Sequence, residues 1–137
     1  MSVPVLYNRC YGGFNLSPAA VALYNERAAS SGAPGLSHVS MAVDVPRTDR
    51  IMAKVVEEMG PPASGYLAKV GVAFVDEKFE DFVKIHEYDG FESVGIDFKG
   101  YKLCKIQEIV QSEEEDAMKL ANISSILNED EPTVKTD

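Results

Sequence analysis

The sequence predicts an α+β fold, in which helices pack on one face of a small, mixed and largely antiparallel sheet. Two observations predict this class. Apolar residues recur with a period of two in some short segments and with a helical period in others. Extended and helical segments alternate only in the first half, where three extended segments then follow one another before two helical ones. The predicted order is β-α-β-α-β-β-β-α-α over 137 residues, a length that suits one core.

The first strand and helix are predicted by strand-forming residues followed by a helix start. Residues 3–8 contain two valines, a leucine and a tyrosine, which favour a strand. Gly12-Gly13 interrupts the chain. Ser17-Pro18 then supplies an N-cap and a proline at the first helical position.

A second strand and helix are predicted in the same way. Apolar and polar residues alternate over residues 39–45, which favours a half-buried strand that Pro46 ends. Thr48 or Asp49 is the expected cap of the next helix, whose apolar residues recur at spacings of three and four. Gly60 ends this helix.

The middle of the chain is predicted to be an antiparallel meander. Residues 67–75 are apolar and rich in β-formers. Two further extended segments, 83–88 and 91–98, flank Asp89-Gly90. An Asp-Gly pair between two such segments is a strong indication of a β-hairpin.

The C-terminal region is predicted to be a helical hairpin. The pattern K-L-x-x-I-x-x-I-aliphatic begins at Lys102 and recurs seventeen residues later at Lys119. Between the two copies, Ser112 and Glu115 form a capping box. A single continuous helix would place Glu113 on its apolar side, so two short helices are favoured.

We expect one domain over residues 1–128, with residues 101–128 as the helical-hairpin extension and residues 129–137 as a disordered acidic tail. The net charge is −9, and residues 112–137 hold eight acids and two lysines. Such a chain repels a phosphate backbone at long range, so no nucleic-acid partner is expected.

No membrane association is expected either, because no apolar run approaches the ~20 residues that a spanning helix needs. The sequence shows no signal-peptide pattern. Cys10 and Cys104 fit no disulfide framework or zinc spacing. These features together favour a cytoplasmic, reducing location.

The loop after the first strand contains most of the candidate ligand-binding residues. Gly12-Gly13 precedes a helix start, where backbone N–H groups and the helix dipole favour an anion, and Arg9 and Tyr11 lie beside it. Neither the dinucleotide-binding nor the P-loop glycine pattern is present, so no cofactor is expected. The simpler interpretation is a turn in which the glycines adopt positive φ.

Cys10 is the one candidate nucleophile. It would need a nearby base, for which the sequence offers His38 and His86. A free cysteine at a strand end is more often a small buried apolar residue, so no catalytic residue is assigned and enzymatic activity is not favoured.

Arg47 and Asp49 are candidates for the same ligand site. If the first two strands are parallel neighbours, both following loops open at one sheet edge, where α/β ligand sites gather. The alternative is that Asp49 caps the helix and pairs with a nearby arginine. Carboxylates around the hairpin, at Glu87, Asp89 and Glu92, are better explained by a solvated turn than by a metal site.

Three segments within residues 3–98 resemble a family of small uncharacterised proteins encoded by tailed bacteriophages and large DNA viruses. They are Tyr7-Asn8-x-Cys10-Tyr11-Gly12-Gly13-Phe14 with Ser17 and Tyr24, Arg47-x-Asp49 with residues 55–60 and 63–65, and Glu87-Tyr88-Asp89-Gly90-Phe91-Glu92. Thr48 departs from the family, which usually has histidine there. The resemblance implies a viral or phage setting, with the host cytoplasm or the virion as location, and no activity.

Two functions follow as hypotheses. The first is a non-enzymatic protein-interaction module that binds a protein partner, or self-associates as a homodimer, through its C-terminal helices. The second is a small anionic-ligand-binding protein or enzyme with a site at the Gly12-Gly13 loop and Arg47.

Overall fold

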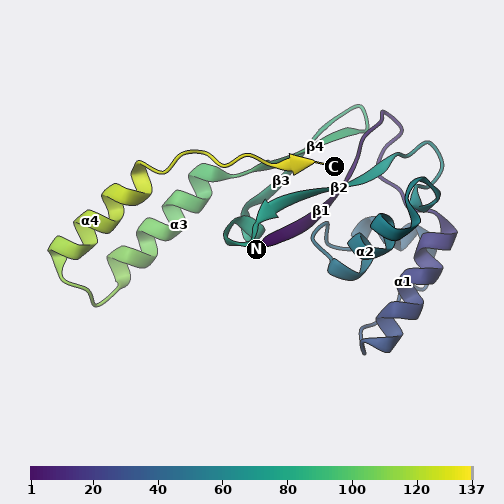
Figure 1. Cartoon of the computed structure of the whole chain (residues 1–137), viewed down its shortest axis with the longest axis horizontal. Coiled ribbons are helices and arrows are strands. Elements are labelled where there is room, and N and C mark those ends of the chain that lie inside the picture. Colours follow the sequence, from purple (N-terminus) through teal and green to yellow (C-terminus); the bar gives the residue numbers. More distant parts are fainter. Residues whose placement is uncertain (137) are drawn as a thin grey trace.

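The computed structural model describes residues 1–136 (Figure 1). In chain order, its elements are β1 (Ser2–Asn8), α1 (Pro18–Ser30), a 3-10 helix (Val39–Asp44), α2 (Arg50–Met59), a short 3-10 turn (Pro61–Ala63), β2 (Val70–Asp76), a further 3-10 helix (Glu77–Phe82), β3 (Val83–Tyr88), β4 (Phe91–Ile96), α3 (Phe98–Gln111), α4 (Asp116–Leu127) and β5 (Lys135–Thr136). The predicted α+β class is confirmed, with two consecutive helices after β4.

The strands form two small sheets, and every pairing in them is antiparallel. β2 lies between β1 and β5, and β3 pairs with β4 as a hairpin across the Asp89-Gly90 turn. The sheet was expected to be mixed. It is not, because residues 39–45, expected as the second strand, contain a 3-10 helix instead. After this 3-10 helix, one backbone hydrogen bond reaches the edge of β1: Leu6 N–H donates to the carbonyl oxygen of Arg47 at 2.8 Å.

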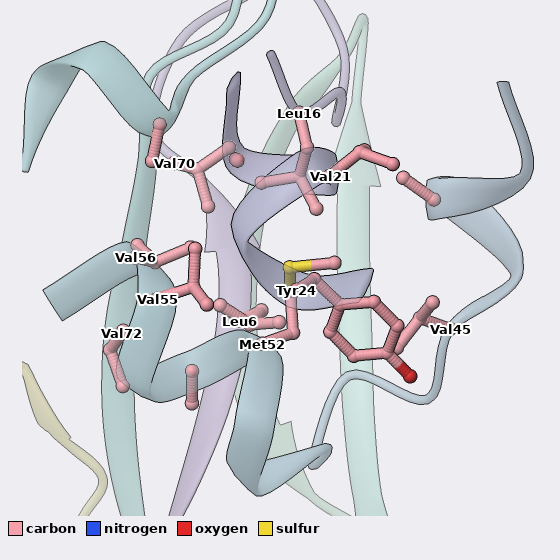
Figure 2. Packing of buried hydrophobic residues seen from close by; sticks show 14 of the residues in the cluster. Leu6, Leu16, Val21, Tyr24, Val45, Met52, Val55, Val56, Val70 and Val72 are labelled. Atoms are coloured by element: carbon pink, nitrogen blue, oxygen red, sulfur yellow. The ribbon is translucent and has the colours of Figure 1, made fainter. Parts of the chain in front are cut away.

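The larger core lies between β1, β2 and helices α1 and α2. Figure 2 shows Leu6 and Val72 from the strands meeting Leu16, Tyr24 and Met52 from the helical side. Both helix starts are as expected. Ser17 accepts a hydrogen bond from Ala20 N–H, and Asp49 accepts one from Met52 N–H. These caps hold α1 and α2 over one face of the sheet.

A second, smaller core lies on the opposite face of the sheet. Successive residues of a strand point to opposite sides, so Val3, Val5 and Val75 face away from the helices. The β3–β4 hairpin covers them with Val83, Ile85, Val94 and Ile96. The sheet therefore lies between two helices and a hairpin.

The helical hairpin α3–α4 projects from this body, and the chain then returns along it (Figure 1). Tyr101 anchors the base of α3 against Phe79 and Phe82, with ring centroids 4.6 and 5.6 Å away.

The tail, expected to be disordered, is instead fixed to the sheet by β5, whose residues pair with Ala73 and Phe74. Val134 packs into the smaller core. An exposed strand edge favours added pairing, which explains why two residues suffice here. Residue 137 of the predicted tail lies outside the described residues.

Candidate functional site

Three sequence motifs that lie far apart in the chain lie against one another in the fold. The loop after β1, the segment before α2 and the tip of the β3–β4 hairpin meet around the carboxylate of Glu92. We call this group the motif cluster: Asn8, Cys10, Gly12, Gly13, Phe14, Arg47, Gly90 and Glu92. Arg47 and the Gly12-Gly13 loop thus share a region, although Arg47 follows a 3-10 helix and not a strand parallel to β1.

Arg47 and Glu92 form the central ion pair of the motif cluster. The Arg47 nitrogens Nη1 and Nη2 donate to the two carboxylate oxygens at 2.6 and 2.9 Å. The Glu92 side chain is only 7% exposed and the Arg47 side chain 23% exposed. The guanidinium carbon of Arg47 lies 3.7 Å from the ring centroid of Phe14, on the loop after β1. The pair therefore fixes that loop to the hairpin.

Asn8 connects the same parts through its backbone and its side chain. Its N–H donates to Glu92 Oε1 at 2.9 Å. Its side-chain amide donates to the carbonyls of Cys10 and Gly90, at 2.7 and 2.8 Å, and accepts from Lys69 N–H at 2.8 Å. The residue is fully buried, so these bonds satisfy groups that would otherwise destabilise the fold.

The glycines of the cluster are required by close packing and by backbone conformation. A Cβ on Gly12 would lie 1.6 Å from the carbonyl oxygen of Leu67, and one on Gly90 would lie 2.5 Å from that of Tyr11. Gly13 has a φ of 89°, the conformation that a glycine turn requires. The loop is thus held between the hairpin tip and the segment that precedes β2.

Cys10 contacts hydrogen-bond acceptors rather than a base. Its sulfur lies 3.0 Å from the carbonyl oxygen of Leu67 and 3.5 Å from Asn8 Oδ1. The two candidate bases lie elsewhere: His38 accepts from Ser40 N–H at the 3-10 helix, and His86 lies beside Gly95 on the hairpin. This geometry gives the thiol a structural contact, and neither of the two candidate bases contacts it.

The remaining candidates are dispersed. Asp49 caps α2, and Tyr11 is 66% exposed, with its ring 5.2 Å from that of Phe91. Arg9 lies in a separate cavity with Lys69, away from the ion pair.

Sequence reasoning missed the two most buried polar residues, Asn8 and Glu92. Glu92 was assigned to a solvated turn. Its position two residues before Val94 and four before Ile96 places all three on the inward face of β4. This alternation of inward and outward residues along β4 is the sequence signal that predicts a buried Glu92.

Comparison with protein-family models, with curated proteins and with solved structures finds no match for this chain. Among residues 1–136, no helix is long and apolar enough to cross a membrane. Nor do three or more His, Cys, Asp or Glu side chains gather as metal ligands in that part of the chain.

Proposed function

We propose that the protein is a non-enzymatic interaction module that uses α3–α4 as its docking surface and a second copy of the chain as its partner. The observation that carries this proposal is the exposure of large apolar side chains on the hairpin. Five of them are 55–69% exposed, and α4 has no buried residue; they are Leu103, Val110, Met118, Leu120 and Leu127. Such side chains are typical of a surface that another protein covers.

Two reciprocal contacts indicate a local two-fold axis between the two helices. Lys102 Nζ donates to the carbonyl of Leu127, and Lys119 Nζ donates to the carbonyl of Val110, both at 3.1 Å. Lys102 and Lys119 are equivalent positions of the seventeen-residue repeat, and so are Val110 and Leu127. Antiparallel helices with reciprocal contacts have their two-fold axis perpendicular to the plane that contains both helices.

This symmetry places the apolar stripes of both helices on one face. With 3.6 residues per turn, Leu103 lies almost in line with Val110, and Leu120 with Leu127. Rotation about the two-fold axis exchanges the Leu103–Val110 pair with the Leu120–Leu127 pair. Both pairs therefore lie on the same side of the hairpin. We call this surface the hairpin face.

Lys99 at the base and Asp116 at the tip lie one helical turn before Leu103 and Leu120, at the ends of the stripes. Between these ends the hairpin face suits a second copy, because the positions beside its stripes carry no charge. They are Cys104, Gln107 and Gln111 on α3, and Ala117, Ala121 and Ser124 on α4. Interface cores are depleted of charged residues. In a chain of net charge −9, two copies repel least where each presents few acids, and a two-fold surface pairs with itself in an isologous contact.

The distribution of charge along the hairpin favours one relative orientation of the two copies in the proposed dimer. Residues 113–116 at its tip are four consecutive acids, whereas Lys99, Lys102 and Lys105 lie within the first eight residues of α3, towards its base. A tip-to-base arrangement places acids of one copy near lysines of the other. A tip-to-tip arrangement would bring eight acids together. The proposed dimer is therefore an antiparallel four-helix bundle.

We place this module in a viral or phage setting, in the host cytoplasm or the virion. The support is the resemblance of the three segments that form the motif cluster. The resemblance implies a setting but no chemical reaction, and a binding role requires none.

The oligomeric state tests the proposal. Sedimentation equilibrium of the full chain is expected to give about twice the 15.0 kDa monomer mass, and the double variant L103E/L120E is expected to give the monomer mass. Val43→Glu is the matched control, because Val43 is 49% exposed and lies on the 3-10 helix after α1. A monomeric native chain, or a double variant that dimerises like the control, would contradict the proposal.

A further inference from the structure

Two cations face each other at the end of the β1–β2 ladder. The ladder pairs Asn8 with Val70, and Arg9 N–H then donates to the carbonyl of Lys69 at 2.8 Å. Both residues line one cavity of about 200 Å³, between the start of β2 and the end of α2. Like charges at directly opposite strand positions destabilise a sheet.

Neither cation is neutralised by a residue of the described part of the chain. Among residues 1–136, no carboxylate lies within ion-pair distance of Arg9 or Lys69. The Nε atom of Arg9 is buried and has no hydrogen-bond acceptor. Glu57 borders the same cavity and pairs with neither. Because Nε is closed off from solvent, a ligand in the cavity would stabilise the site by neutralising the two cations and not by reaching Nε.

The surrounding residues make room for the guanidinium and add a donor. A Cβ on Gly71 would lie 2.6 Å from Arg9 Nε, so the glycine allows Arg9 to lie against β2. Ser64 Oγ accepts from Val70 N–H at 2.9 Å, which leaves its own proton to donate. Guanidinium, ammonium and hydroxyl donors thus surround one small cavity.

We infer that this cavity binds a phosphate group, either as free phosphate or as the phosphate of a small phosphomonoester. The charges of Arg9 and Lys69 exceed the single negative charge of Glu57 on the same lining, so the cavity favours an anion. Arginine binds phosphate oxygens with its planar array of N–H donors, and lysine binds them as a point charge. The site is separate from the motif cluster and from the hairpin face, and it does not depend on the proposed function.

Calorimetric titration of the full chain with inorganic phosphate, glycerol phosphate and acetate, at constant ionic strength, tests the inference. The native chain is expected to bind a phosphate compound more tightly than acetate. Lys69 is exposed, so Lys69→Gln is expected to fold and to weaken binding at least about tenfold, as the loss of a charge-assisted bond requires. Tighter binding of glycerol phosphate would identify an ester as the ligand, and equal binding would identify free phosphate; both support the site.

Two further variants make the test specific. Gly71→Ala keeps both charges but displaces Arg9, so it is expected to weaken binding as Lys69→Gln does. Lys54→Gln removes an exposed lysine outside the cavity and is expected to bind like the native chain. The inference is overturned if neither phosphate compound binds, or if Lys69→Gln and Lys54→Gln give equal dissociation constants.

Discussion

Glu92 determines how the loop after β1 is held. Its carboxylate accepts three hydrogen bonds, two from Arg47 and one from Asn8 N–H, and all three join segments far apart in the sequence. Desolvation offsets much of the attraction in a buried ion pair, whereas loss of one partner leaves an uncompensated charge. The pair therefore matters most for keeping this one arrangement of the cluster.

Glu92→Ala is expected to lower the free energy of unfolding by about 3–5 kcal/mol, because Arg47 then remains partly buried without its partner. Urea denaturation, monitored by circular dichroism, measures this free energy of unfolding. Asp81→Ala, at an exposed carboxylate before β3, is expected to change it by less than about 0.5 kcal/mol. The double variant R47M/E92L is expected to be more stable than Glu92→Ala. Equal stability of Glu92→Ala and Asp81→Ala would show that the ion pair does not hold the loop.

The sequence predicts some of this cluster at residue level. The glycine turn, the Ser17 cap and the Asp49 cap depend on local chemistry, and each is present. The need for glycine at position 12 depends on the carbonyl of Leu67, which is 55 residues away in the chain. No local pattern contains that contact.

At the scale of elements, residues 39–45 show that an alternation of apolar and polar residues is not enough to form a strand. Their apolar and polar residues alternate as in a strand, yet residues 39–44 form a 3-10 helix in which only Ala42 is buried. His38 caps it by accepting from Ser40 N–H. A strand requires a partner along its length, and the only backbone bond to β1 here comes from Leu6 to Arg47. Whether a partner is available is a tertiary property.

Two surface ion pairs link elements and make stability depend on acid pH. The hydrogen bond from Arg50 lowers the pKa of Glu80, which joins α2 to the 3-10 helix before β3. The hydrogen bond from Arg27 lowers the pKa of Glu58, which joins α1 to α2. A carboxyl group with a lowered folded-state pKa stabilises the fold above its unfolded pKa, and this contribution is lost as pH falls through the folded pKa.

We therefore expect the free energy of unfolding to fall as the pH decreases below the ordinary glutamate pKa of 4.5. Glu80→Gln is expected to reduce this dependence slightly, because exposed pairs contribute little. Urea denaturation at a series of pH values from 7 to 2 measures both. Glu131→Gln, at an exposed glutamate without an ion pair among residues 1–136, is the control. If the pH dependence of stability of Glu80→Gln matched that of Glu131→Gln, the Arg50–Glu80 pair would not be a source of this dependence.

At the scale of the whole molecule, the sequence predicts the parts better than their arrangement. The seventeen-residue repeat predicts two helices, and its equivalent lysines make equivalent contacts. The projection of the hairpin from the body (Figure 1) depends on Tyr101, whose contacts with Phe79 and Phe82 fix only the base of α3. The repeat indicates an apolar surface, but only the arrangement shows that the body leaves it uncovered.

The orientation of the proposed dimer can be tested by exchanging charges between the base and the tip of the hairpin. In the tip-to-base arrangement, Lys99 of one copy lies near the acidic tip of the other. Lys99→Glu is then expected to weaken dimerisation several-fold, since each exposed ion pair contributes about 0.2–1 kcal/mol and the dimer contains two such contacts. Adding Glu113→Lys to it is expected to restore the affinity.

Sedimentation equilibrium at low and at high salt measures these dissociation constants, and the differences are expected to shrink at high salt because exposed charges are screened. A tip-to-tip dimer gives the opposite pattern. There Glu113→Lys alone would strengthen association by relieving repulsion between the acidic tips, and Lys99→Glu would leave it unchanged. The two single variants together thus decide which end of the hairpin meets its partner.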